Sequence, residues 1–406
     1  MTSAREEVDE ENDDIEPYPF GPARRLELHP RFAELRATKP VAEVRLPYGG
    51  RAWLLTRYAD IKTAMNDPRF RRTTPEDPDV PRTTEDYPAS RESLLTAPPQ
   101  EHMRLRRLVM KAFTHREIEK LREQAQVIVD GLIDDMVERG SPADLGEAIA
   151  WQLPIRIICK ILGGDVADKD RFAKWAVQVQ GSQGREQMEQ GHAELNAHLA
   201  QLVAARRAAP ADDLLSSLVL ARDEGDRLTE EELISTGMVL LVGGFETSAN
   251  QICNSVYTLL ERPELWNRLV ESPEYVPNAV EELLRFLPLV QETTFPVVAG
   301  ADIELSGVLI KEGDAVISFP YAGNRDPEVF DRPEEIDLTR SENPHLTFSH
   351  GVHHCLGAAL ARMEIQVVLD LLVRRLPRLR LAIPAEDVEW RSDLLLRTIR
   401  RLPVAW

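Results

Sequence analysis

The chain has few cysteines, no internal repeat and no long apolar run. Its 406 residues include 3 cysteines, at positions 159, 253 and 355, and no CxxC pair. This spacing argues against a disulfide framework or a zinc knuckle and indicates a reducing compartment. The longest apolar stretch, residues 233–245, is too short and too interrupted to span a bilayer. The N-terminal segment has no basic region followed by an apolar one, so we expect a cytoplasmic protein without membrane contact.

Positive charge is outnumbered, with 49 Lys and Arg against 68 Asp and Glu. The formal net charge is −19, and residues 6–16 alone carry 8 acids. Because phosphate binding needs clustered Lys and Arg, we expect no nucleic-acid partner. Residues 1–17 are predicted to be an acidic disordered tail. No Pro-, Gly- and Ser-rich linker divides the remainder, which predicts one domain over residues 18–406.

Helical periodicity dominates the chain. It predicts helices over 58–66, 101–112, 115–138, 144–162, 166–180, 187–207, 211–222, 229–261, 273–287 and 358–376. Alternation of polar and apolar residues predicts a hairpin over 39–58 and short strands over 295–320 and near the C-terminus. Residues 71–100 and 321–347 are expected to be irregular. Many helices with few strands predict a fold that is mainly α with a minor β portion.

Cys355 lies in the sequence FSHGVHHCLG, directly before an apolar helical pattern. A sulfur at a helix N-terminus meets free backbone N–H groups, which lower the pKa of a thiol. Gly351 permits a tight turn, and Gly357 lets a flat cofactor approach the backbone. Phe348 can pack beneath such a cofactor, and His353 can bind an anionic group at its edge. A lone cysteine is ordinarily buried and inert, but these neighbours favour a ligand.

The long helix predicted over residues 229–261 begins with a capping-box pattern and contains the sequence GGFET. Gly243 and Gly244 each cost about 1 kcal/mol relative to Ala inside a helix. A helix retains such residues where something packs closely against it or where it distorts. Glu246 and Thr247 follow directly. Taken alone, this pattern favours a flexible kink that carries an ordinary buried threonine.

Two charged pairs stand at helical spacing. Glu282 and Arg285 are three residues apart, and His102 and Arg106 are four residues apart, so each pair occupies one helical face. Taken alone, both patterns predict ordinary surface pairs.

In this order and spacing, these motifs resemble the cytochrome P450 family, in particular soluble bacterial members of the actinomycete macrolide and polyketide tailoring type. The resemblance implies the cytochrome P450 fold, in which a long central helix lies over a haem b ligated by a C-terminal cysteine loop. Cys355 would then be the iron ligand. Gly243 and Gly244 would form the oxygen groove, and Glu246 and Thr247 would organise proton delivery.

The resemblance also assigns the remaining cofactor contacts. His102, Arg106 and His353 would form a cationic clamp on the haem propionates, and the loop around Cys355 would contribute Phe348, Gly351 and Gly357. Glu282 and Arg285 would be a buried structural pair bonded to the irregular segment ahead of the loop. The chain departs from the family pattern twice: Val297 replaces an arginine of the clamp, and Ser349 replaces a glycine of the loop. The first departure predicts thinner propionate anchoring, or an anchor supplied from elsewhere.

The activity implied by the resemblance is a haem-thiolate monooxygenase that inserts one atom of O2 into an apolar small molecule. We expect a monomer acting on a macrolide- or polyketide-type natural product, by hydroxylation or epoxidation. Because the sequence has no flavin or nicotinamide fingerprint, electrons are expected from a ferredoxin and its reductase. Candidate ferredoxin contacts are Arg104, Arg107 and Lys111, although these residues fit an ordinary solvated basic face equally well. Candidate substrate contacts are Leu94, Leu240, Gly243, Val290, Thr294 and Leu395.

Three alternatives stay open from the sequence. The substrate could be a steroid, a terpene or another xenobiotic. The protein could hold haem through a thiolate without hydroxylating anything, although the pair Glu246 and Thr247 argues against this. A binding or structural protein without haem is the third alternative.

Overall fold

The computed structural model of the chain describes residues 15–21, 24–73, 80–83, 94–179, 185–221, 228–290, 296–391 and 396–406. The described helices are α1 Arg31–Thr38, α2 Tyr58–Asn66, α3 Pro99–Val109, α4 His115–Arg139, α5 Gln152–Leu162, α6 Lys169–Val179, α7 Arg185–Ala208, α8 Leu214–Ala221, α9 Glu230–Glu261, α10 Pro263–Glu271, α11 Val276–Phe286, α12 Pro320–Gly323 and α13 Ala358–Arg375. None of them is long and apolar enough to cross a bilayer.

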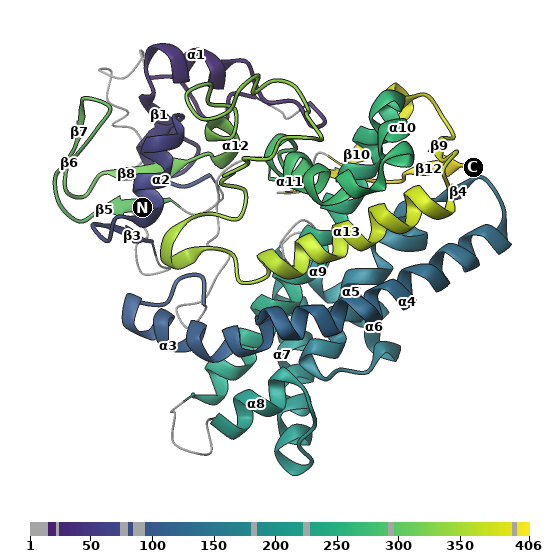
Figure 1. The fold of residues 1–406 in the computed structure, drawn as a ribbon. Coiled ribbons are helices and arrows are strands. Elements are labelled where there is room, and N and C mark those ends of the chain that lie inside the picture. Colours follow the sequence, from purple (N-terminus) through teal and green to yellow (C-terminus); the bar gives the residue numbers. More distant parts are fainter. Residues whose placement is uncertain are drawn as a thin grey trace.

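Strands are short and form small sheets. They are β1 Val41–Leu46, β2 Gly50–Leu55, β3 Phe70–Arg72, β4 Ala143–Asp144, β5 Val297–Ala299, β6 Ile303–Leu305, β7 Val308–Ile310, β8 Ala315–Ser318, β9 Arg380–Leu381, β10 Trp390–Arg391, β11 Thr398–Ile399 and β12 Pro403–Ala405. The largest sheet has the order β1-β2-β8-β5-β3. Strands β1 and β2 form an antiparallel hairpin, in which Val41 pairs with Leu55 at one end and Leu46 with Gly50 at the other. The prediction of a mainly α fold with minor β is confirmed (Figure 1).

Helix α9 is the central element of the described helices. It begins with the predicted capping box: the Glu232 amide donates to Thr229 Oγ1 at 3.0 Å, and the Thr229 amide donates to Glu232 Oε2 at 2.8 Å. Most of its residues from Phe245 to Leu260 are buried, because α5, α6, α7 and α13 all pack against it. In Figure 1, α13 crosses in front of α9, while the largest sheet lies to one side with α1 and α2. The site described below is built from these elements.

Several predicted boundaries need correction. The helix predicted over 144–162 is instead the strand β4, a π-helical turn over residues 146–150, and then α5. Helix α10 was not predicted at all. The expected tail ends earlier than residue 17, because the Arg45 amide donates to the Glu16 carbonyl at 2.9 Å alongside β1. Residues 1–14, and much of the predicted irregular segment over 71–100, lie outside the described part of the chain.

Candidate functional site

The three cysteines differ in accessibility. Cys159 in α5 and Cys253 in α9 are buried, and burial raises the pKa of Cys159 to about 12, so both thiols are inert. Cys355 is the exposed one of the three. It precedes Gly357, the N-cap of α13, so the predicted place of the sulfur at a helix N-terminus is confirmed.

The expected low pKa of the Cys355 thiol is not found. Burial within the surrounding protein raises the pKa, and this effect exceeds the lowering by the Gly357 backbone N–H and by the charges of Arg106 and Arg362. Cys355 nevertheless keeps exposed surface, so the sulfur is enclosed by protein but open on one side. A neutral thiol in such surroundings ionises when a metal cation takes up the negative charge.

Backbone geometry holds the cysteine loop in a tight turn. Gly351 has φ +71°, and a Cβ at this position would lie 2.7 Å from Asn66 Oδ1 and 2.9 Å from the Met65 carbonyl oxygen. Only glycine therefore permits the loop to lie against the end of α2. Ser349, which replaces the expected glycine, has φ +64°. The turn thus keeps a left-handed residue at this position, and the serine bears the steric cost.

Helix α9 contributes an open face next to two polar side chains. Gly243 is exposed in the middle of the helix, and a Cβ there would meet no atom within 4 Å. The Thr247 hydroxyl donates to the Gly243 carbonyl at 2.5 Å, and Glu246 is buried. Gly244 does not face this opening: a Cβ there would lie 3.2 Å from Ile158 Cδ1 of α5. We therefore correct the expectation for Gly244, which permits close helix packing, whereas Gly243 forms the open groove.

The predicted propionate residues from α3 and the cysteine loop lie together. The ring centroids of His102 and His353 are 4.2 Å apart, and Arg106 donates to the His354 carbonyl at 2.6 Å. Burial, aided by nearby positive charges, lowers the pKa of His102 to about 4 and that of His353 to about 3. Burial and the neighbouring cations therefore favour the neutral form of both rings. They can still donate N–H bonds.

Arg72 in β3 is a fourth member that the sequence did not reveal. It lies directly opposite Val297 in the antiparallel pair β3–β5, so the two side chains share one face of the sheet. Its charge lowers the pKa of both His102 and His353, which places it near them. A guanidinium is therefore present beside the position where Val297 replaces the expected arginine. Strand register, which no short motif encodes, brings it there.

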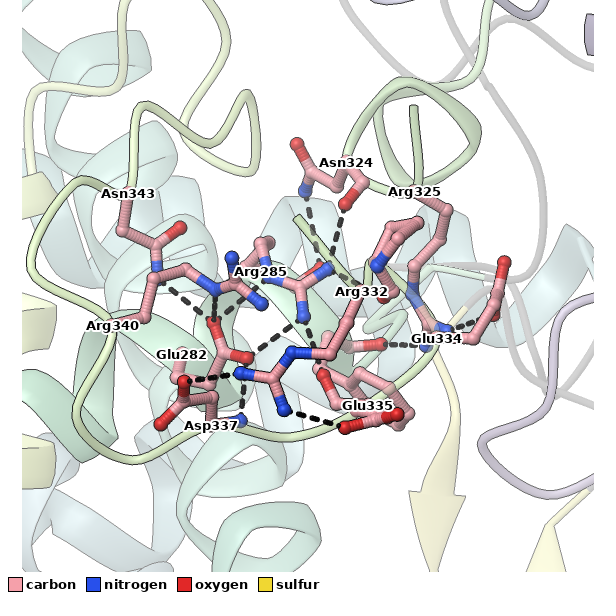
Figure 2. A network of polar contacts seen from close by, with 12 residues as sticks. Glu282, Arg285, Asn324, Arg325, Arg332, Glu334, Glu335, Asp337, Arg340 and Asn343 are labelled. Carbon is pink, nitrogen blue, oxygen red and sulfur yellow. Dashed lines mark hydrogen bonds and ion pairs between the residues drawn. The ribbon is translucent and has the colours of Figure 1, made fainter. Parts of the chain in front are cut away.

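Glu282 and Arg285 form a fully buried ion pair, as the resemblance implied, and not the surface pair that the bare pattern would suggest. Arg285 Nη2 lies 2.8 Å from Glu282 Oε1, and neither side chain has exposed surface. Arg285 also donates to the carbonyl oxygens of Asn324 and Pro333, each at 2.8 Å, and of Glu335 at 2.9 Å. Figure 2 shows the pair enclosed by the irregular segment that follows α12.

The same network reaches the cysteine loop. Asn324 Oδ1 accepts a bond from the Leu346 amide at 2.7 Å, and its Nδ2 lies 3.0 Å from Thr347 Oγ1. Phe348 follows Thr347 in the chain, and its carbonyl accepts a bond from the Cys355 amide at 2.8 Å. Through Asn324, helix α11 therefore holds Leu346 and Thr347, the two residues that lead into the cysteine loop.

A surface groove of about 540 Å³ lies between α3 and the cysteine loop. Arg107 and Lys111 line it, together with Met103, Met110 and Val352, which are among the exposed large apolar side chains. Arg104, the third predicted ferredoxin contact, does not line it and instead pairs with Glu232 at the start of α9. Two of the three predicted contacts therefore share this surface.

The predicted substrate contacts are only partly placed. Leu94 and Leu240 are buried in the same apolar cluster. Val290 forms an isolated bridge with Leu396, which brings the segments after α11 and before β11 together. Thr294 and Leu395 lie outside the described residues.

The donor set fits a haem group. An open cysteine sulfur can ligate iron, the open face of Gly243 leaves room beside α9, and Arg106 and Arg72 can neutralise two carboxylates. No cluster of three His, Cys, Asp or Glu side chains among the described residues offers an alternative metal site.

Comparisons with known proteins point the same way. The family described as cytochrome P450 matches residues 171–394, more than half of the chain. The chain is 47% identical over 397 residues to nocardicin C N-oxygenase of Nocardia uniformis subsp. tsuyamanensis, covering 97% of this chain and 99% of the relative. It is 46% identical over 391 residues to mycinamicin IV hydroxylase/epoxidase of Micromonospora griseorubida, covering 96% and 98%. The crystal structure of the LnmA cytochrome P450 hydroxylase, from the leinamycin pathway of Streptomyces atroolivaceus S-140, superposes with a TM-score of 0.92 at 47% identity, covering 97% of this chain and all of that one.

Proposed function

The chain belongs to the cytochrome P450 family and is a monooxygenase of that family, and we propose that it holds haem b through Cys355. The observation that carries this proposal is the contrast among its cysteines. Cys159 and Cys253 are buried within helices, whereas Cys355 is exposed at the N-terminus of α13 in a turn that α2, α3 and α11 support. Haem, when bound there, supplies the iron at which O2 is activated.

We propose that Thr247 and Glu246 handle protons beside the open face of Gly243. The Thr247 hydroxyl can donate to one partner and accept from another, and in the structure it donates to the Gly243 carbonyl. Rotation about its side-chain bond would turn the hydroxyl toward the groove. Glu246 is buried next to it, so a proton that it releases would reach the groove with little competition from bulk water.

Haem anchoring is proposed to rest on Arg72, Arg106, His102 and His353. The two guanidinium groups would balance the charge of the propionates, and the neutral imidazoles would donate N–H bonds. Arg72 would replace the arginine that the family usually carries at the position of Val297, since the two side chains are cross-strand neighbours.

We propose that a ferredoxin docks on the groove between α3 and the cysteine loop. Exposed Met103, Met110 and Val352 provide an apolar centre, and Arg107 and Lys111 provide positive charge. An acidic electron-transfer protein would match this surface in charge. Gly351 and Val352 of the cysteine loop line the groove, so electrons that enter there would have a short path to a cofactor held by Cys355.

The substrate is proposed to be an apolar natural product of macrolide or polyketide type. The support is the identity to mycinamicin IV hydroxylase/epoxidase, and two of the candidate contacts, Leu94 and Leu240, are buried apolar side chains. Hydroxylation and epoxidation are the proposed reactions.

The test is turnover with a reconstituted electron supply. The haem-loaded protein, a ferredoxin, its reductase and NAD(P)H are incubated with a panel of macrolides and polyketides, and products are analysed by mass spectrometry. A product heavier by one oxygen atom, which carries ¹⁸O from ¹⁸O2, supports the proposal. Substrate-induced spin-state shifts without any oxygenated product would reject the monooxygenase assignment for those compounds.

A further inference from the structure

Three side chains form a compact cluster behind the cysteine loop. Glu281 of α11 accepts two bonds from Arg362 of α13, with Nε 2.8 Å from Oε1 and Nη2 2.9 Å from Oε2. His345 Nε2 lies 3.2 Å from Glu281 Oε2, and its side chain is almost fully buried. None of the three residues belongs to a motif that the sequence analysis identified. Such a bidentate arrangement fixes the guanidinium plane.

The cluster contacts the loop through Phe348. Arg362 Cζ lies 4.5 Å from the centroid of the Phe348 ring. The centroids of the His345 and Phe348 rings are 5.9 Å apart, and the two ring planes meet at 47°. The Phe348 carbonyl in turn accepts the bond from the Cys355 amide at 2.8 Å. Arg362 therefore packs on the side chain of the residue whose carbonyl holds the Cys355 amide.

The charge of Arg362 also reaches the sulfur directly. The two lie close enough for a direct electrostatic interaction, which favours negative charge on the sulfur. Burial would raise the pKa of Glu281, but the bonds from His345 and Arg362 outweigh it and hold that pKa at about 2. Glu281 is therefore ionised at working pH, and the positive charge near Cys355 is partly balanced by a fixed negative one.

We propose that Glu281, His345 and Arg362 are positioning residues that orient Phe348 and set the net charge beside Cys355, and thereby the reduction potential of the bound haem. This inference rests on the proposed ligation of haem by Cys355. In each variant, the charge that is removed determines whether the reduction potential rises or falls.

Positive charge near iron favours the ferrous state, which carries one positive charge fewer. Arg362→Gln should therefore lower the reduction potential, and Glu281→Gln should raise it. Glutamine keeps much of the shape of each side chain and some of its hydrogen bonds. Because the pair is about one-quarter to one-third exposed (30% and 27%), solvent weakens the effect. We expect the ferrous-to-ferric ratio at a fixed potential to change roughly threefold or more in each direction.

The experiment is a dye-mediated spectroelectrochemical titration of the haem-loaded protein, which needs neither substrate nor ferredoxin. Arg362→Lys keeps the charge and loses the planar contact with Phe348, so its potential should lie between those of wild type and Arg362→Gln. The matched control is the pair Asp370 and Arg374, four residues apart on the same helix, with a 2.9 Å ion pair away from the loop. Asp370→Asn and Arg374→Gln remove the same charges and should leave the potential unchanged.

Opposite shifts for Arg362→Gln and Glu281→Gln, with unchanged controls, support the inference. Shifts of the same sign in both variants, or no shift, overturn the inference. If the cluster only supported the loop structurally, losing either partner would change the reduction potential in the same direction. If Arg362→Gln does not fold, Glu281→Gln alone decides, since an upward shift is required. A wild-type protein without the ferrous–CO band of a thiolate-ligated haem would instead refute the proposed function, so the two failures can be told apart.

Discussion

Replacing Arg72 is the perturbation that distinguishes a complete haem clamp from a thin one. From the sequence alone, Val297 predicts weak anchoring that Val297→Arg should strengthen. In the structure, Arg72 stands directly opposite Val297 and lowers the pKa of His102 and His353. Arg72→Gln should therefore accelerate haem loss, whereas Val297→Arg should bring little gain, because it would place two like charges opposite each other.

The expected size follows from the hydrogen bond that Arg72 would make to a propionate. A bond to a charged group contributes about 1.5–3 kcal/mol. Arg72 is half-buried, so the lower value applies, and about 1.5 kcal/mol corresponds to roughly tenfold faster haem release. The double variant with Arg72→Val and Val297→Arg moves the guanidinium across the strand pair, and it should restore most of the lost retention.

The assay is haem transfer to excess apomyoglobin, followed in the Soret region. Arg71→Gln is the matched control: Arg71 is the neighbouring residue of β3, but it is exposed and points to the other face of the sheet. An Arg72→Gln variant that releases haem at the wild-type rate, or no faster than Arg71→Gln, would refute the role of Arg72. Failure of the double variant to recover retention would show that Val297 occupies a place no guanidinium can use.

Three further outcomes are expected. Thr247→Ala should keep haem and fold but yield less product per NAD(P)H oxidised, because the hydroxyl next to Gly243 is gone. An unchanged ratio of product to NAD(P)H would show that Thr247 contributes only packing. Glu282→Ala and Arg285→Ala should each cost about 3–5 kcal/mol of folding stability, since each leaves a buried charge unpaired; soluble yield and melting temperature at wild-type level would contradict this. Ser349→Gly should stabilise the protein by about 0.5–1 kcal/mol, because it removes a side chain from a left-handed position; a lower urea midpoint would show that the serine makes a compensating contact.

Local patterns predicted most of the helices. The capping box at Thr229 correctly marked the start of α9, and the range predicted for the helix over 58–66 is that of α2. Helix α10 was missed because only Arg262 separates it from α9. Pro263, its first residue, looks in the sequence like the end of the preceding helix. The π-helical turn over residues 146–150 has no distinctive composition, and its geometry is imposed by packing against α4 and α9.

The site divides along the same line. The cysteine loop, the GGFET sequence and the charged pairs are contiguous motifs, so the sequence could identify them. Arg72 and the cluster of Glu281, His345 and Arg362 depend on strand register and on contacts between distant segments, which no short motif encodes. The pKa of Cys355 was misjudged because a helix N-terminus is visible in the sequence, whereas the burial that outweighs it is not.

The most direct test of the central claim is the difference spectrum of the dithionite-reduced, haem-loaded protein with carbon monoxide, recorded for wild type and Cys355→Ser. We expect wild type to show the red-shifted Soret band of a thiolate-ligated haem. Cys355→Ser should lose this band, since an alcohol is a poor ligand that stays protonated at neutral pH. Cys159→Ser and Cys253→Ser should retain the band, because both thiols are buried in helices. The same red-shifted band in Cys355→Ser would contradict the claim that Cys355 holds the iron.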